Sequence, residues 1–129
     1  MPRPTARRPT DLELEILKAL WRRGPSTVRE VMQTLAQQRP VGYTTVLKML
    51  QIMTEKGLVV RDERQRAHVY RPRESRGKVA RRLAGDLLER AFDGSTRQLL
   101  LHALEYKKAT PAELAEMRRL LDEFERRRK

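Results

Sequence analysis

The segment YTTVLKMLQIMTEKGLVV, residues 43–60, changes its hydrophobic period near its end. Its apolar residues first recur at helical spacing, a pattern made by Val46, Leu47, Leu50 and Met53. Gly57 suits the left-handed conformation that ends a helix, and from Leu58 the period becomes two, which is typical of a strand. The segment therefore predicts a helix capped at Tyr43–Thr44 and ending near Lys56, followed directly by a strand.

The sequence on either side of this segment completes a recognisable order of elements. Thr10–Glu13 and Thr27–Glu30 are capping boxes, in which a Thr side chain and a Glu side chain three residues later bind backbone N–H groups at a helix start. They predict one helix over about residues 11–22 and a second opening at Thr27. Strands at 58–62 and 66–70, separated by a charged turn, predict a two-stranded hairpin. Three helices followed by a hairpin are the order of a winged helix-turn-helix.

The second half of the chain has helical periodicity from Ser75 onward, with a predicted break at Asp93–Ser95 and a capping box at Thr110–Glu113 that predicts the start of the last helix. Its middle helix has apolar residues on more than one face, and a segment this short cannot bury all of them alone. We therefore expect a two-fold homodimer. The predicted dimerisation residues are Leu83, Leu87, Leu100, Leu104, Met117, Leu121 and Phe124. The predicted fold is mainly α with a small β-hairpin: a flexible basic arm at 1–9, a winged-helix domain at 10–74 and a helical dimerisation domain at 75–129.

The charge of the chain points to a polyanionic partner. The 129 residues include 29 Lys and Arg against 17 Asp and Glu, a formal net charge of +12. A field of this size favours nucleic acid. The sequence contains no apolar run long enough to span a bilayer and no signal peptide, which predicts a cytoplasmic protein without membrane insertion.

Several side chains near the start of the central helix and in the hairpin are candidates for DNA contact. Short side chains at a helix start let the backbone approach phosphates, and a cation one turn later can reach a base edge or a phosphate. The predicted DNA-binding residues are Tyr43, Thr44, Thr45, Lys48, Met49, Arg64 and Arg66. Thr44 also fits a simple helix cap, Lys48 a solvated lysine, and Tyr43 an anchor of the turn. The presence of cations on both the helix and the hairpin favours the DNA interpretation.

Other chemistry is disfavoured by composition. The absence of cysteine excludes disulfides and thiolate metal sites, and the two histidines, His68 and His102, do not have metal-ligand spacing. The carboxylates are spread among arginines at helical spacing, as in solvated surface ion pairs, and no phosphate loop or nucleophile motif is present. We therefore predict no enzyme activity, no metal and no cofactor. The alternative to a sequence-specific repressor is a non-specific basic or architectural nucleic-acid-binding protein, and a winged-helix adaptor for a protein partner also remains open.

Four segments resemble the BlaI/MecI/CopY family of bacterial repressors. They are TDLELEILKALW at 10–21, STVREVMQTL at 26–35, YTTVLKMLQIMTEKGLV at 43–59 and HVYRP at 68–72. The resemblance implies a homodimeric repressor with a winged-helix domain and a helical dimerisation domain, bound to palindromic operators of resistance or stress genes. In this family repression is typically lifted when a membrane sensor detects β-lactam and the repressor is cleaved.

Two features of the family pattern are missing from this sequence. The copper-responsive branch has a cysteine motif near its C-terminus, and this chain has no cysteine, so copper sensing is not predicted. The scissile Asn–Phe pair of the β-lactam branch falls near His102–Ala103, where neither residue matches. Cleavage at the same bond is therefore not predicted, and the inducing signal stays open.

Overall fold

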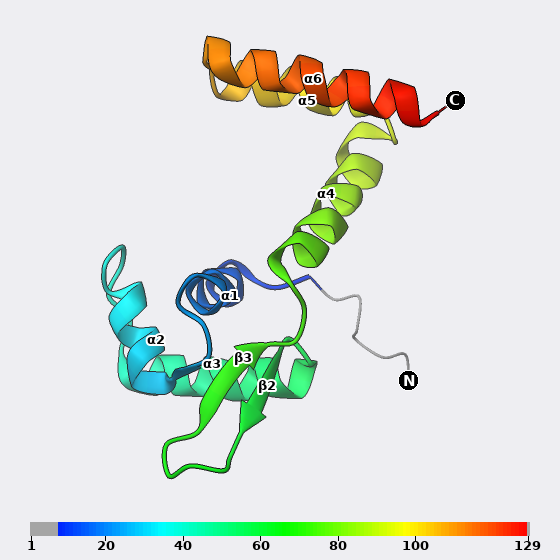
Figure 1. The fold of residues 1–129 in the computed structure, drawn as a ribbon. Coiled ribbons are helices and arrows are strands. Elements are labelled where there is room, and N and C mark those ends of the chain that lie inside the picture. The colour runs from blue at the N-terminus through cyan, green and yellow to red at the C-terminus, as the bar shows by residue number, and fades with distance from the viewer. Residues whose placement is uncertain (1–7, 129) are drawn as a thin grey trace. The chain divides into compact units, whose positions relative to one another are not determined.

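A computed structural model describes residues 8–128, and within them it contains six helices and three strands. The order is α1 (Asp11–Arg23), β1 (Ser26–Thr27), α2 (Val28–Leu35), α3 (Tyr43–Lys56), β2 (Val59–Asp62), β3 (Val69–Pro72), α4 (Arg76–Phe92), α5 (Thr96–Tyr106) and α6 (Pro111–Arg127) (Figure 1). The predicted mainly helical fold with a small sheet is confirmed. Most of the basic arm predicted at 1–9 lies outside the described residues.

Capping boxes start three of the helices as the sequence predicts. In α1, Thr10 Oγ1 accepts a hydrogen bond from the N–H of Glu13 at 3.2 Å, and Glu13 Oε1 accepts one from the N–H of Thr10 at 2.8 Å. Thr27 and Glu30 repeat this exchange at α2, and Thr110 and Glu113 repeat it at α6. Each box satisfies donors that the first turn of a helix leaves unpaired.

The start of α3 differs from the prediction. The N-cap is Gly42, one residue earlier than expected, and no side chain caps this helix. A capping side chain must sit at the N-cap position, and glycine has none, so the predicted cap at Tyr43–Thr44 is wrong. The other end is as predicted, because Gly57 adopts the left-handed conformation with φ 81°.

The sheet has three antiparallel strands in the order β1-β3-β2, where the sequence predicted a two-stranded hairpin. The missed strand, β1, pairs Ser26 with Tyr70. The second predicted strand, 66–70, is also displaced, because pairing of β2 with β3 closes at Asp62 and Val69. The Asp62 carboxylate accepts the N–H of Arg64 and turns the chain early, which leaves residues 63–68 in a longer loop.

The core lies between α1, α2, α3 and the sheet. Its buried members are Ile16, Leu17, Ala19, Leu20, Val28, Val31, Leu35, Val46, Leu50, Met53, Val59 and Tyr70. Trp21 packs half-buried against this core, and its indole Nε1 donates to the backbone oxygen of Glu74 at 3.0 Å. Three residues of α3 are buried in this core, which leaves the opposite face of the helix exposed.

A buried ion pair joins the start of α1 to the end of α3. Lys56 Nζ lies 2.7 Å from Glu13 Oε2, and the Glu13 side chain is 1% exposed. Burial raises the pKa of Glu13, but hydrogen bonds from the Lys56 ammonium and the Thr10 N–H outweigh burial, so the net pKa is below its usual value. The sequence predicted solvated carboxylates. The prediction of solvated carboxylates is therefore wrong for Glu13. Its partner, Lys56, is 43 positions away, so the sequence pattern gave no sign of the pair.

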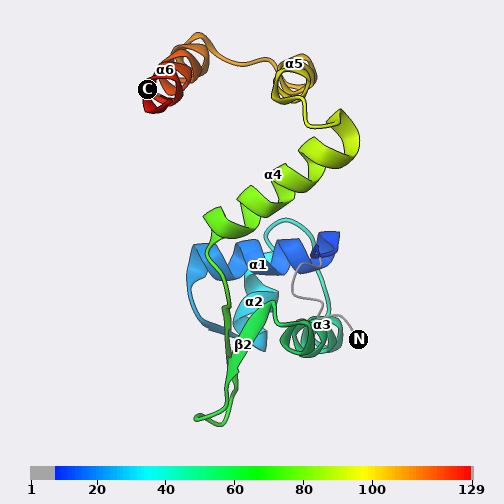
Figure 2. The ribbon, with the colours of Figure 1, turned by 90° about the vertical axis from the view of Figure 1, so that its right-hand side faces the viewer.

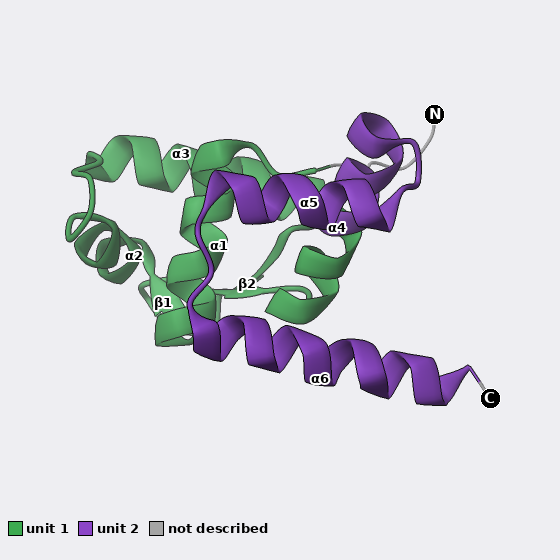
Figure 3. Ribbon diagram, turned by 90° about the horizontal axis from the view of Figure 1, so that it is seen from above, with its two compact units in different colours: residues 1–83 green, residues 84–129 purple. Residues whose placement is uncertain are grey.

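The chain divides into two compact units, residues 1–83 and 84–129, coloured separately in Figure 3. The domain boundary at 74/75 stays a prediction, since α4 begins in one unit and ends in the other. Within the second unit, Asp93 and Gly94 have positive φ and separate α4 from α5, as predicted. No residue of α5 or α6 is buried.

Candidate nucleic-acid interface

The exposed face of α3 carries most of the predicted DNA-contacting residues. Thr44, Thr45 and Lys48 are exposed, and Tyr43 is 45% exposed. They lie away from the stripe of Val46, Leu50 and Met53 that packs into the core. Met49 is half-buried and packs against the core, so less of it is available for contact than the sequence suggested.

The first turn of α3 leaves backbone donors without a side-chain cap. The first intrahelical bond runs from the N–H of Val46 to the oxygen of Gly42, so the N–H groups of residues 43–45 precede it. These groups form the positive end of the helix dipole. Because Thr44 and Thr45 are short, an anion can approach this end closely.

The two predicted wing arginines have different surroundings. Arg64 Nη2 lies 2.7 Å from Asp62 Oδ2, and Arg64 Nε also donates to this carboxylate. The Arg64 side chain and backbone hydrogen bonds lower the pKa of Asp62 to about 2, so the pair is ionised over the ordinary pH range. Arg66 has no carboxylate within ion-pair distance among the described residues. Arg66 is therefore the uncompensated cation of the loop.

The loop between β2 and β3 extends beyond α3 in both ribbon views (Figures 1 and 2). A hollow of about 490 Å³ lies between this loop, the start of α2 and the start of α3. Its lining residues are Thr27, Val28, Arg29, Tyr43, Leu47, Arg66, Ala67, His68 and Tyr70. The structure thus brings Tyr43 and Arg66 to one hollow. Thr44, Thr45, Lys48, Met49 and Arg64 do not line it.

Arg29 is a cation that the sequence analysis missed. Its guanidinium carbon lies 5.8 Å from the centre of the Tyr43 ring, a cation–π geometry. In the sequence, Arg29 falls inside the capping box that opens α2, and nothing in the periodicity connects it with Tyr43. His68, assigned to a strand by the sequence analysis, lies in the loop and lines the same hollow.

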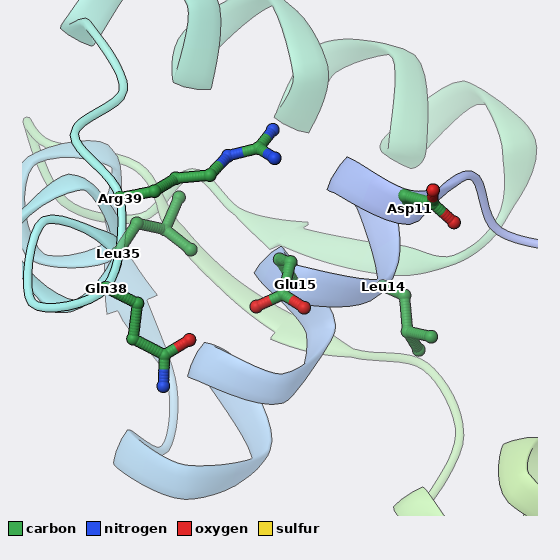
Figure 4. A pocket seen from close by; sticks show the side chains of 6 residues that line it. All are labelled: Asp11, Leu14, Glu15, Leu35, Gln38 and Arg39. Carbon is green, nitrogen blue, oxygen red and sulfur yellow. The ribbon is translucent and has the colours of Figure 1, made fainter. Parts of the chain in front are cut away.

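A second hollow lies on another side of the winged-helix unit (Figure 4). It is lined by Asp11, Leu14 and Glu15 of α1 and by Leu35, Gln38 and Arg39 at and after the end of α2. Two carboxylates on the α1 wall repel phosphate. This hollow is therefore a poor candidate for nucleic acid.

The predicted dimerisation residues are incompletely covered within the described chain. Leu87, Leu100, Leu121 and Phe124 are 39–59% exposed, and Leu83, Leu104 and Met117 are half-buried. The sequence analysis did not include the exposed Leu101, Tyr106 and Leu120. Leu101 and Tyr106 belong to α5 and Leu120 belongs to α6. Their apolar or aromatic character was the sequence signal that could have added them to the predicted dimerisation residues.

Residues 8–128 contain neither a candidate metal site nor a helix that could cross a membrane. No three His, Asp or Glu side chains lie close enough together there to hold a metal ion. No helix in that range combines the length and the apolar character that crossing a membrane requires. His102 lies 3.7 Å from Glu105 and 5.5 Å, between ring centres, from Phe92. His102 therefore has a carboxylate and an aromatic ring as neighbours, and it belongs to no group of metal-binding side chains within residues 8–128.

Comparisons with known proteins match this architecture. The family model described as penicillinase repressor matches residues 9–123. The chain belongs to the penicillinase repressor family. Transcriptional regulator BlaI of Mycobacterium tuberculosis is 38% identical over 117 residues, covering 89% of this chain and 83% of the relative. Penicillinase repressor of Bacillus licheniformis is 25% identical over 120 residues, covering 93% and 94% of the two chains.

A solved structure is also similar to part of the chain. It is the solution structure of the Bacillus licheniformis BlaI monomeric form in complex with the blaP half-operator. The match has 26% identity and a TM-score of 0.46, and it covers 53% of this chain and 83% of that one.

Membership of the penicillinase repressor family defines the general role of the chain. It is a DNA-binding transcriptional repressor with a winged-helix fold, and the family consists of repressors rather than enzymes. The predicted family, fold class and non-enzymatic role are confirmed.

Proposed function

We propose that this penicillinase-family repressor binds a palindromic operator as a homodimer and represses transcription by covering the promoter. The observation that carries the proposal is the exposed face of α3. Lys48 and the two threonines are exposed there, and Lys48 has no carboxylate partner within the described residues. A face with an uncompensated cation and short polar side chains fits the DNA major groove.

In the proposed complex, α3 enters the major groove by its N-terminal turn. Thr44 and Thr45 allow close approach of the backbone, and Lys48 reaches a guanine acceptor or a phosphate one turn further along. Met49 offers its remaining exposed surface to a thymine methyl group. Arg66, and more weakly the Asp62-paired Arg64, reach flanking phosphate or the minor groove.

The apolar side chains of the second unit support the proposed homodimer. Leu120, Leu121 and Phe124 of α6 are each more than half exposed. Covering apolar side chains of this size with a second copy of the chain removes them from water and stabilises the dimer. A two-fold dimer presents two copies of α3 to two half-sites, which is why a palindrome is the proposed operator.

The regulated genes are proposed from the relatives. The family and the Bacillus licheniformis relative are penicillinase repressors, so we propose resistance or stress-response genes as targets, bound in the cytoplasm. Relief of repression through a membrane sensor and protease stays a prediction from the family resemblance. His102 and Ala103 lie within helix α5, where the chain is not in the exposed-loop conformation that proteases favour.

The test is selection of duplexes from a library with a randomised central region, using the full chain. We expect enrichment of a palindrome, with affinity for it that falls steeply with salt but stays above that for a scrambled duplex. Enrichment of no sequence would overturn the proposal in favour of a non-specific architectural protein. No binding to any duplex would favour a protein-binding adaptor.

Lys48→Ala tests the role of α3 on the selected duplex. The variant should weaken specific binding by roughly 1–3 kcal/mol if the lysine reads a base, and by less if it contacts only phosphate. Fluorescence anisotropy with selected and scrambled duplexes measures both effects. Wild-type affinity in this variant would show that Lys48 is only a solvated side chain.

A further inference from the structure

The hollow between α2, α3 and the β2–β3 loop has polar groups that the fold itself does not use. Thr27 is committed to its capping box, where its hydroxyl accepts the Glu30 N–H and its own N–H binds the Glu30 carboxylate. Among the other lining residues, Arg29, Tyr43 and Arg66 come from three different elements. None of these three side chains is needed to close a helix or the sheet.

The charge in this hollow is uncompensated. Arg29 and Arg66 have no carboxylate within ion-pair distance among residues 8–128, whereas nearby arginines do: Arg23 pairs with Glu30, Arg61 with Glu63 and Arg64 with Asp62. Two guanidinium groups that line one hollow without a counter-charge repel each other. An anion placed between them removes this repulsion and gains charge-assisted hydrogen bonds.

Arg29 also has an aromatic neighbour before any ligand arrives. Its guanidinium carbon lies over the Tyr43 ring, 5.8 Å from the ring centre, and this cation–π contact restricts the side chain while it leaves the guanidinium N–H groups free to donate. Preorganisation of this kind reduces the entropy lost on binding. Planar guanidinium donors match the oxygens of a phosphate group in geometry.

We propose that Arg29, which lies over the Tyr43 ring, and Arg66 together hold one backbone phosphate of the operator, so that a phosphate contact beside the first turn of α3 sets the position of that helix in the groove. The inference rests on the proposed function, because it assigns a second contact to the same DNA. The hollow adjoins α3 at Tyr43, and the phosphates of B-DNA border the groove that the helix enters. A phosphate contact positions the protein and carries no base information by itself.

The experiment replaces single phosphates of the selected duplex by neutral methylphosphonates and measures the affinity of the full chain for each duplex. Wild type should lose about tenfold at one phosphate in each half-site, the scale of one charge-assisted contact. Arg29→Gln should bind the unmodified duplex about tenfold more weakly, and its further loss at that phosphate should be smaller than that of wild type, because only Arg66 still contacts it. The slope of log affinity against log salt concentration should become shallower by about 0.9 for each phosphate contact that the variant loses.

Two variants separate a local contact from a loss of net charge. Arg22→Gln removes the same charge from an exposed residue of α1 that does not line the hollow, so it should keep the methylphosphonate sensitivity of wild type. Arg29→Lys keeps the charge but loses the planar donors, and should fall between Arg29→Gln and wild type. Arg29→Gln should also weaken binding to selected and scrambled duplexes by similar factors.

The outcomes distinguish this inference from the proposed function. If wild type selects a palindrome but Arg29→Gln remains as sensitive as wild type to every methylphosphonate, the inference is wrong and the proposed function stands. If wild type selects no sequence, the proposed function itself fails. Inorganic phosphate titrated against the free protein should bind only at high millimolar concentration. Tight binding of free phosphate that Arg29→Gln abolishes, without a sensitive position in the duplex, would overturn the assignment to DNA.

Discussion

The two units of the chain bury their apolar residues to very different extents. The first encloses Ile16, Leu50 and Met53 almost completely, whereas in the second no residue of α5 or α6 is buried and Leu121 is 59% exposed. A unit with a closed core is stable by itself, and one with exposed apolar faces gains stability from a partner. The comparison separates a winged-helix unit whose core is closed within one chain from a unit whose apolar side chains remain exposed.

The largest expected effect comes from opening the closed core. Leu50→Ala removes a fully buried side chain from the stripe that holds α3 and should lower the free energy of unfolding by about 2–5 kcal/mol. Urea unfolding followed by circular dichroism measures this loss. Leu87→Ala, at a side chain that is 49% exposed in the second unit, is the comparison. An equal loss in both variants would contradict the difference between the units.

The next effect concerns the exposed faces of α6. Leu121→Asp puts a charge among apolar side chains and should convert a dimer into a monomer, with operator affinity reduced roughly 100-fold or more as the two half-sites become independent. Sedimentation and anisotropy measure the two changes. Ala112→Asp adds the same charge at an exposed position of α6 and should change neither. A monomeric wild type at micromolar concentration would remove the dimer proposal.

A smaller effect sharpens how the first unit holds α3. Glu13→Gln leaves Lys56 without its buried ionic partner and should cost about 1–3 kcal/mol of stability. Because the folded pKa of Glu13 lies below the unfolded value of 4.5, its contribution is present above pH 4.5 and is lost as pH falls through the folded pKa.

The pH dependence distinguishes the ion pair from simple packing. Wild-type stability should fall as pH is lowered below about 4.5, and this part of the slope should be smaller in Glu13→Gln. Urea unfolding between pH 3 and pH 7 is the measurement, with Glu15→Gln, a half-buried neighbour on α1, as control. If the free energy of unfolding changes with pH by the same amount in wild type and in Glu13→Gln, protonation of the Glu13 carboxylate makes no contribution to stability.

The smallest effect compares the two arginines of the loop. Arg66→Gln should weaken operator binding more than Arg64→Gln, because Asp62 already compensates the charge of Arg64. The difference should be of order 1 kcal/mol or less, as for a single exposed charge. Anisotropy at two salt concentrations measures it. Equal losses would show that DNA displaces Asp62 from Arg64 on binding.

Much of this structure could be predicted from the sequence, and the errors share a cause. The capping boxes at Thr10, Thr27 and Thr110 were found because each is a contact over three residues. The third strand was missed, because pairing of Ser26 with Tyr70 depends on how the chain folds back. Helical periodicity placed the candidate DNA-contacting residues of α3 on one side of the helix. It could not predict that Arg64 pairs with Asp62 or that Arg29 lies over the Tyr43 ring.

The sequence by itself determined the helices, the capping boxes of three of them, the family and the exposed side of α3, because periodicity and capping boxes depend on residues a few positions apart. Only the tertiary structure decided which charges remain uncompensated. Lys56 finds Glu13 across 43 positions, and Arg29 lies over the ring of Tyr43 from a different helix. Electrostatic interaction depends on distance in space, and distance in sequence does not determine it once the chain has folded.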